Sequence, residues 1–248
     1  MAWLLPADAR SARHPYVCCS KNEEDLPGTS VLDIPYYNPI TLARRLTTID
    51  YLSNGRLRAG FGLGWSKDEM IATGADNKPR GPMAEEFLQL LKAIWTQNPV
   101  EFDGKFYKVP KSYIDLKPLQ KPHPPIYLAA FAPPALDRTA RLADGWNPTG
   151  MPVEVMAQMF SSIKQMAPKA GRDASTLEMV VRANLHITDK PLGKDRHIFS
   201  GTLDQIKEDT AACRQIGAHE VFFEPGFAPI SLTLGRWLAL MEQLRTFV

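Results

Sequence analysis

The stretch from Asn38 to Trp65 constrains the fold most strongly, because it predicts a helix, a turn and a buried strand in direct succession. Asn38 is suited to cap the helix, and Pro39 fits a first turn, where a missing N–H costs nothing. Apolar residues recur at helical spacing at Leu42, Leu46, Ile49 and Leu52 and predict one buried face. Ser53-Asn54-Gly55 then ends the helix.

Glycines gather at the end of the strand that follows, which we expect from Leu57 to Gly62. Gly60, Gly62 and Gly64 lead to Trp65, and glycine at the end of a strand lets a flat ligand approach the backbone. A tight bend without any ligand explains the same glycines equally well. The run is not a dinucleotide-binding fingerprint, because Trp65 stands where the third glycine is needed.

Strand and helix patterns alternate along most of the chain, which predicts an α/β fold with a parallel sheet and helical crossovers. We expect about six core strands, at residues 30–34, 57–62, 125–130, 144–147, 178–187 and 220–223. Residues 100–116 predict a hairpin on the Asp103-Gly104 turn, and Thr202 to Gln205 form a capping box. We expect one domain over residues 29–248, preceded by an irregular segment at residues 1–28.

The bulk composition excludes several function classes. The chain has 248 residues, 44% hydrophobic and 23% charged, and a net charge of +2 without a basic stripe, so we expect no nucleic-acid partner. There is no apolar run of about 18 residues to span a membrane. Three cysteines are too few for a disulfide framework, and the five histidines lack metal-ligand spacing. We therefore expect a cytoplasmic protein without a metal centre.

Several motifs together resemble the luciferase-like monooxygenase superfamily, whose members are flavin- or deazaflavin-dependent oxidoreductases on a TIM barrel. The resemblance rests on their order and spacing and covers residues 28–226. The motifs are Leu42-Ala43, Thr48-Ile49-Asp50, Leu52 to Arg56, Gly60 to Trp65, Arg80, Glu85-Glu86, Phe102 to Tyr107, Pro124 to Ala130 and Ala143 to Trp146. The sequence of residues 118–130 and 141–148 resembles that of the subgroup that uses the deazaflavin coenzyme F420 more than that of the FMN monooxygenases.

The strand count differs from that of a complete barrel, which has eight strands. Members of the resembled family normally have two or three further βα units before the strand at Ser30. The resemblance therefore implies a TIM-barrel-like (β/α) fold that is incomplete at its N-terminal side. A bare sheet edge invites pairing with another chain, so we also expect self-association as a homodimer.

The resemblance places a cofactor at the carboxyl ends of the strands. Deazaflavin enzymes of the family carry a Gly-Gly pair where this chain has Phe131 and Ala132, and the cofactor phosphate lies there. Helix N-terminal N–H groups bind phosphate, and the donors here would be Phe131, Ala132, Ala135 and Leu136, since Pro133 and Pro134 have none. The expected cofactor-binding residues are Gly62, Gly64, Trp65, Ala130, Phe131, Ala132, Ala135 and Trp146. The alternatives are an ordinary proline-initiated helix and, for Trp65 and Trp146, tryptophans that simply pack.

Polar residues near strand ends give further candidates. Arg182, Asn184 and His186 alternate along one strand and share a face, which is a ligand surface if it points inward and a solvated face if it points outward. Glu224 ends the last strand and would act as a base or pair with a cation. Tyr36 and Tyr37 would bond a substrate or pack.

The resemblance implies an oxidoreductase that uses coenzyme F420, or FMN as the alternative, for hydride transfer or monooxygenation of a small organic substrate. The chain shows no strong nucleophile or acid–base constellation, which fits enzymes whose cofactor carries the redox chemistry. The sequence therefore assigns no catalytic residue. The competing hypothesis is an inactive barrel remnant that binds a flavin-like ligand or only self-associates.

Overall fold

The fold is built on a curled sheet of six parallel strands. The computed structural model of the chain describes residues 26–75, 79–224 and 234–247. The sheet order is β1-β2-β5-β6-β7-β10, and every pairing in it is parallel. The strands are β1 (Leu32–Asp33), β2 (Ala59–Gly62), β5 (Ile126–Leu128), β6 (Gly145–Trp146), β7 (Glu178–Asn184) and β10 (Glu220–Glu224). This confirms an α/β fold with an incomplete barrel.

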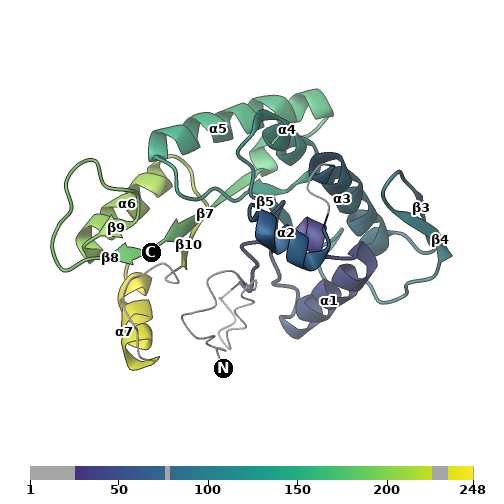
Figure 1. Cartoon of the computed structure of the whole chain (residues 1–248), viewed down its shortest axis with the longest axis horizontal. Helices are drawn as coiled ribbons and strands as arrows, with labels where there is room; N and C mark the ends of the chain where they lie inside the picture. Colours follow the sequence, from purple (N-terminus) through teal and green to yellow (C-terminus); the bar gives the residue numbers. More distant parts are fainter. Residues whose placement is uncertain (1–25, 76–78, 225–233, 248) are drawn as a thin grey trace.

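Helices cover the outer, convex face of this sheet. Figure 1 shows α1, α3, α4, α5 and α6 following one another in an arc around it. The helices are α1 (Pro39–Leu52), α2 (Lys67–Thr73), α3 (Arg80–Thr96), α4 (Pro133–Leu142), α5 (Val153–Met166), α6 (Leu203–Gln215) and α7 (Leu234–Arg245). Short 3₁₀ turns lie at Ile34–Tyr36, Ala167–Ala170 and Ala174–Thr176.

Two small strand pairs lie outside the main sheet. The antiparallel pair β3 (Val100–Asp103) and β4 (Lys108–Ser112) confirms the predicted hairpin. The parallel pair β8 (His186–Ile187) and β9 (Ser200–Gly201) was not predicted. It also ends β7 at Asn184, because His186 bonds to Phe199 instead of continuing the main sheet.

Helix α1 forms as the sequence predicts. The Asn38 side chain accepts hydrogen bonds from the N–H groups of Ile40 (3.0 Å) and Thr41 (3.2 Å). Leu42 and Leu46 are buried, whereas Leu52 is 79% exposed. The prediction that Leu52 belongs to the inner face was wrong, because the buried stripe of α1 runs through Leu46 and Asp50 and Leu52 lies outside it.

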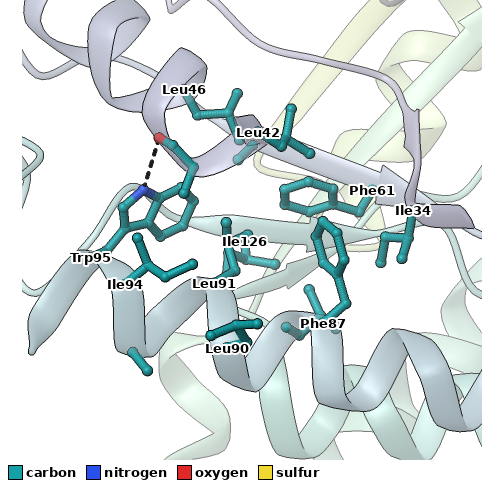
Figure 2. Packing of buried hydrophobic residues seen from close by; sticks show 14 of the residues in the cluster. Ile34, Leu42, Leu46, Phe61, Phe87, Leu90, Leu91, Ile94, Trp95 and Ile126 are labelled. Carbon is teal, nitrogen blue, oxygen red and sulfur yellow. Dashed lines mark hydrogen bonds between the residues drawn. The ribbon is translucent and has the colours of Figure 1, made fainter. Parts of the chain in front are cut away.

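A first apolar layer joins β1, β2 and β5 to α1 and α3. Figure 2 shows Phe61 and Ile126 of the sheet facing Phe87 and Leu91 of α3. The Phe61 and Phe87 rings meet edge to face with centroids 6.3 Å apart. The Trp95 indole donates to the Ala43 carbonyl at 3.3 Å and so ties α3 to α1.

A second apolar layer lies between β6–β7 and helices α4, α5 and α6. Met179, Val181 and Ala183 are fully buried in it, and they alternate with half-buried residues along β7. α6 begins with the predicted capping box, in which Thr202 and Gln205 bond to each other's backbone N–H. The alternation shows that the other face of β7 points to the concave side.

The concave face is polar and strongly curved. Arg58, directly before β2, reaches Glu220 of β10 at 2.8 Å, although three strands separate them in the sheet. Four strand spacings in a flat sheet amount to about 19 Å, which these two side chains do not bridge. Arg182 of β7 likewise donates to the Ser30 carbonyl before β1 at 2.8 Å. The sheet therefore curls enough for side chains to meet across its interior.

One expectation lies mostly outside the described residues, and one helix inside them was not expected. The irregular segment predicted for residues 1–28 lies almost entirely outside the described residues, and only Gly28 of it is seen to bridge to Arg58. Helix α2 was not predicted, although Ser66 caps it by accepting from the Glu69 N–H at 3.3 Å. A serine directly after Trp65 was the available signal for that helix.

Candidate functional site

The carboxyl ends of β1, β2 and β5 meet the N-terminus of α4 around a small cavity. Its lining includes Gly62 and Leu63 after β2, Ala129 and Ala130 after β5, and Arg138 of α4. The cavity is about 10 Å³, the space of roughly one water molecule. Of the sequence-predicted residues, Gly62, Ala130 and Ala135 line it. The structure thus brings three predicted positions to one place.

The N-terminus of α4 offers fewer donors than predicted. The N–H groups of Ala135 and Leu136 both donate to the Ala132 carbonyl, at 2.8 and 3.0 Å. The prediction that they are free phosphate donors was wrong, because the first turn of α4 closes on itself. Within residues 26–75, 79–224 and 234–247, the N–H groups of Phe131 and Ala132 have no hydrogen-bond acceptor. These two remain as donors at the positive end of the helix dipole.

Arg138 adds a buried cation to this helix end. Its side chain is only 9% exposed, and its Nε has no hydrogen-bond partner in the described part of the chain. Glu85 of α3 lies 4.0 Å from that Nε, but both Glu85 oxygens accept from Arg141, at 2.6 and 3.0 Å. A buried donor without an acceptor is costly, so an anion oxygen at this point would be stabilising.

The glycines at the end of β2 make room for the protein's own strand. A side chain on Gly62 would place its Cβ 2.6 Å from Asp33 Oδ1 and 2.7 Å from Val31 Cγ2. Gly64 has a φ of +72°, and a Cβ there would lie 2.9 Å from the Tyr36 hydroxyl. The inference that these glycines leave bare backbone for a flat ligand needs correction, since neighbouring side chains fill that space. A ligand reaching the end of β2 from the concave side would meet the Asp33 carboxyl.

The aromatic candidates divide into buried and exposed residues. Trp146 is fully buried in the layer beneath α4 and α5, where its indole donates to the Ala130 carbonyl at 2.8 Å and stacks on Phe160. This position favours the packing alternative for Trp146 over a pocket wall. Trp65 and Phe131 are 73% and 50% exposed, and they follow the neighbouring strands β2 and β5.

The concave face carries a second group of polar residues at the ends of β6, β7 and β10. Arg182 and Asn184 point inward as predicted for one alternative, whereas His186 is exposed on β8. Glu224 pairs with Arg182 at 3.6 Å, in agreement with a carboxylate that pairs with a cation. Asn184 donates to Thr149 at 3.0 Å, while its buried Oδ1 has no partner among the described residues.

Asp33 is the functional candidate that the sequence analysis missed. It is half-buried at the end of β1, and its Oδ1 accepts from the Gly64 N–H at 2.9 Å. Burial raises the pKa of Asp33, as does the negative charge of Glu69, whereas the Gly64 N–H and Arg182 act in the opposite direction. Burial similarly raises the pKa of the Tyr36 hydroxyl to about 12. An acidic residue within the apolar strand before Pro35 was the signal.

The described ranges contain neither a cluster of metal ligands nor a helix suited to a membrane. No three His, Cys, Asp or Glu side chains there come together as metal ligands would. None of the described helices combines the length and the apolar character needed to cross a membrane.

The chain matches a family model. The model for luciferase-like monooxygenases matches residues 28–193, which include the cavity, Arg138 and both strand ends with exposed aromatics.

The names of two curated relatives mention two different cofactors. An uncharacterised protein of Mycobacterium tuberculosis is 34% identical over 71% of this chain and 63% of its own length. An F420-dependent glucose-6-phosphate dehydrogenase of Nocardia farcinica is 29% identical over 84% of this chain and 60% of its own length. An FMNH₂-dependent dimethylsulfone monooxygenase of Pseudomonas putida is 33% identical over 54% and 38%. The chain thus spans less than two thirds of these relatives.

A solved structure shows the same fold. The coenzyme F420-dependent tetrahydromethanopterin reductase of Methanopyrus kandleri superposes with a TM-score of 0.69 and 16% identity. The match covers 82% of this chain and 78% of that chain. At this identity the likeness concerns the fold alone.

Proposed function

The chain belongs to the luciferase-like monooxygenase family, and on this premise we propose that it is an oxidoreductase that uses coenzyme F420 for hydride transfer to or from a small organic substrate. The single observation that carries the proposal is the donor set at the N-terminus of α4. Phe131 and Ala132 offer two N–H groups, and Arg138 offers a buried guanidinium donor beside the same cavity.

The two N–H groups suit the phosphate of a flavin-type cofactor, whereas the cavity beside Arg138, with space for roughly one water molecule, would admit at most one of its oxygens. A helix N-terminus binds anions through N–H groups without an intrahelical acceptor and through its dipole. Arg138 supplies charge where solvent is largely excluded, so its contribution is screened less than that of a surface arginine. The side chain of Phe131 is 50% exposed and leaves the N–H of its own residue available.

The exposed aromatics suit the ring end of the same cofactor. Trp65 and Phe131 come from adjacent strands and would hold a planar ring at the carboxyl edge of the sheet, where barrels bind their ligands. A bound deazaflavin would supply the hydride chemistry. The residues of this chain would bind its phosphate, orient its ring and limit water at the strand ends.

FMN is the second candidate cofactor, and one relative is named for reduced FMN. Both cofactors carry a phosphate on the side chain of the ring, so the donor set at α4 would accept either. The inactive-remnant hypothesis differs from both, because it predicts no turnover and, in its stronger form, no binding.

The experiment is a pair of titrations. Wild type and Ala132→Asp are titrated with coenzyme F420 and, separately, with FMN, following fluorescence. A carboxylate at the start of α4 repels phosphate and removes about 1–3 kcal/mol of binding, so the dissociation constant should rise at least several-fold. Ala170→Asp adds the same charge at an exposed position after α5 and should bind as wild type does. Equal affinity of all three proteins would contradict the proposed phosphate site, and the absence of coenzyme binding to wild type would contradict the proposed function.

We also propose that the chain self-associates as a homodimer. In the described residues the sheet ends at β1 and at β10, and each of these strands pairs on one side within that sheet. A second copy would cover such an edge. Light scattering at micromolar concentration should give twice the 27.7 kDa mass of one chain, and a stable monomer would contradict this.

A further inference from the structure

We propose that Asp33 is the catalytic acid–base group of the reaction, and that it exchanges a proton with the oxygen of a hydroxyl or carbonyl substrate. This inference rests on the proposed function and names the substrate class of the same site. It goes beyond the resemblance, which assigns no residue to proton transfer.

The position of Asp33 in the sheet suits a group that exchanges a proton with a substrate. Its register partner in the sheet is Gly62, so the carboxyl lies over a residue without a side chain. The Gly64 N–H holds Oδ1 at 2.9 Å and fixes the direction of the carboxyl. Oδ2 makes no hydrogen bond within the described residues and is not among their fully buried atoms. One oxygen is thus held in place while the other remains available on the concave side.

Charged and titratable groups surround Asp33 and influence its pKa. Glu69 of α2 faces it with a like charge, and Arg182 of β7 faces it with an opposite charge. Tyr36 and Tyr37 lie close enough for Asp33 to raise the pKa of both hydroxyls. Glu224 pairs with Arg182 and moderates its effect. Burial is the largest influence on Asp33 and raises its pKa toward neutrality, as a proton-transferring group requires.

The chemistry balances for an alcohol and its ketone. When the alcohol is oxidised, its C–H bond breaks, and a bound oxidised deazaflavin would accept the hydride with its electron pair. The O–H bond breaks, its proton passes to the Asp33 carboxylate, and its electron pair forms the second bond of the carbonyl. The reverse reaction takes a hydride from the reduced coenzyme and the proton from Asp33. A single carboxyl next to the expected ring position is sufficient for both directions.

The test uses the full chain and three variants. Asp33→Asn keeps an acceptor for the Gly64 N–H but has no titratable proton, and Asp33→Glu keeps the carboxyl. Asp68→Asn makes the same charge change at an exposed position in the first turn of α2 and is the matched control. Coenzyme F420 affinity is measured for all four proteins. Reduction of the bound coenzyme by a panel of secondary alcohols is then followed by absorbance from pH 5 to 9.

The expected result is at least a 100-fold slower reduction in Asp33→Asn with coenzyme affinity within about threefold of wild type, since general acid–base catalysis contributes 10²–10⁴-fold. Asp33→Glu should restore part of the rate, and Asp68→Asn should match wild type. Carbon-13 NMR of labelled aspartates, without coenzyme, should show a carboxyl with a pKa raised above 3.8 whose signal is lost in Asp33→Asn and Asp33→Glu but kept in Asp68→Asn.

The outcomes separate the two proposals. No coenzyme binding to wild type overturns the proposed function and this inference with it. If wild type binds the coenzyme but no alcohol reduces it, or if Asp33→Asn reduces it at the wild-type rate, the inference alone is overturned. The absence of that NMR titration also overturns it.

Discussion

The two ends of the strands differ in how well their polar groups satisfy one another. At the N-terminal ends, Arg58 bonds to Glu220, lies 3.7 Å from Glu178 and stacks over the Tyr127 ring, while the Tyr127 hydroxyl donates to Glu178. At the C-terminal ends, donors and acceptors without described partners remain on Phe131, Ala132, Arg138 and Asn184.

This difference separates stability from function along the same strands. Groups that satisfy one another hold strands together, and β2, β5, β7 and β10 all contribute to the N-terminal network. Groups left without partners cost stability unless a ligand satisfies them. We therefore expect substitutions of the paired charges at the N-terminal ends to lower the free energy of unfolding, and substitutions of the groups without described partners at the C-terminal ends to change binding instead.

Arg58→Met should give the largest loss of stability. It leaves the Glu178 and Glu220 carboxylates close to each other without their cation. Both glutamate side chains are about one third exposed, so the expected loss is about 2 kcal/mol and not the larger figure for a fully buried pair. Urea unfolding followed by circular dichroism measures it. Arg45→Met on the exposed side of α1 is the control, and an equal loss there would contradict the role of the network.

Gly62→Ala should come next, with a loss of about 1–2 kcal/mol. The added Cβ would displace Asp33 and Val31, whose atoms lie 2.6 and 2.7 Å from its position. Gly193→Ala, which meets nothing within 4 Å, should be neutral in the same unfolding experiment. If both variants have the same free energy of unfolding as wild type, the close approach of β1 to β2 does not hold in solution.

Asp33→Asn should have the smallest effect and the opposite sign. The raised pKa means that the folded protein keeps the Asp33 proton to higher pH than the unfolded chain does. Ionising Asp33 therefore costs stability, and the cost develops as pH rises from 3.8 through the folded pKa. The variant lacks this cost, so at pH 7 it should be more stable than wild type. The gain should vanish near pH 3, and a variant less stable than wild type at pH 7 would contradict the account.

The sequence predicted the elements whose signals are local. The cap at Asn38, the hairpin predicted on Asp103-Gly104 and the capping box at Thr202 each depend on neighbouring residues, and all three formed, although the loop of the hairpin is residues 104–107. The limits of β7 were not predictable, because the partner of His186 lies at Phe199, beyond an irregular loop.

The site was less predictable, because it depends on contacts between distant residues. The free side of Arg138 exists only because Arg141 takes both oxygens of Glu85, which lies on another helix. Asp33 matters because the sheet pairs it with Gly62, a long-range register that no local pattern reveals. Trp146 could face either side of its strand, and only the packing of α4 and α5 decides that it is buried.

Hydrogen exchange with and without coenzyme tests the central claim most directly, namely that ligand binding belongs to the C-terminal ends of the strands. Amide exchange is measured by mass spectrometry for the full chain alone, with coenzyme F420 and with FMN. The account predicts slower exchange at residues 62–65 and at the N–H groups of Phe131 and Ala132, with no change at the starts of β7 and β10. A bound coenzyme that protects the starts of β7 and β10 instead, or leaves Phe131 and Ala132 unchanged, would contradict it.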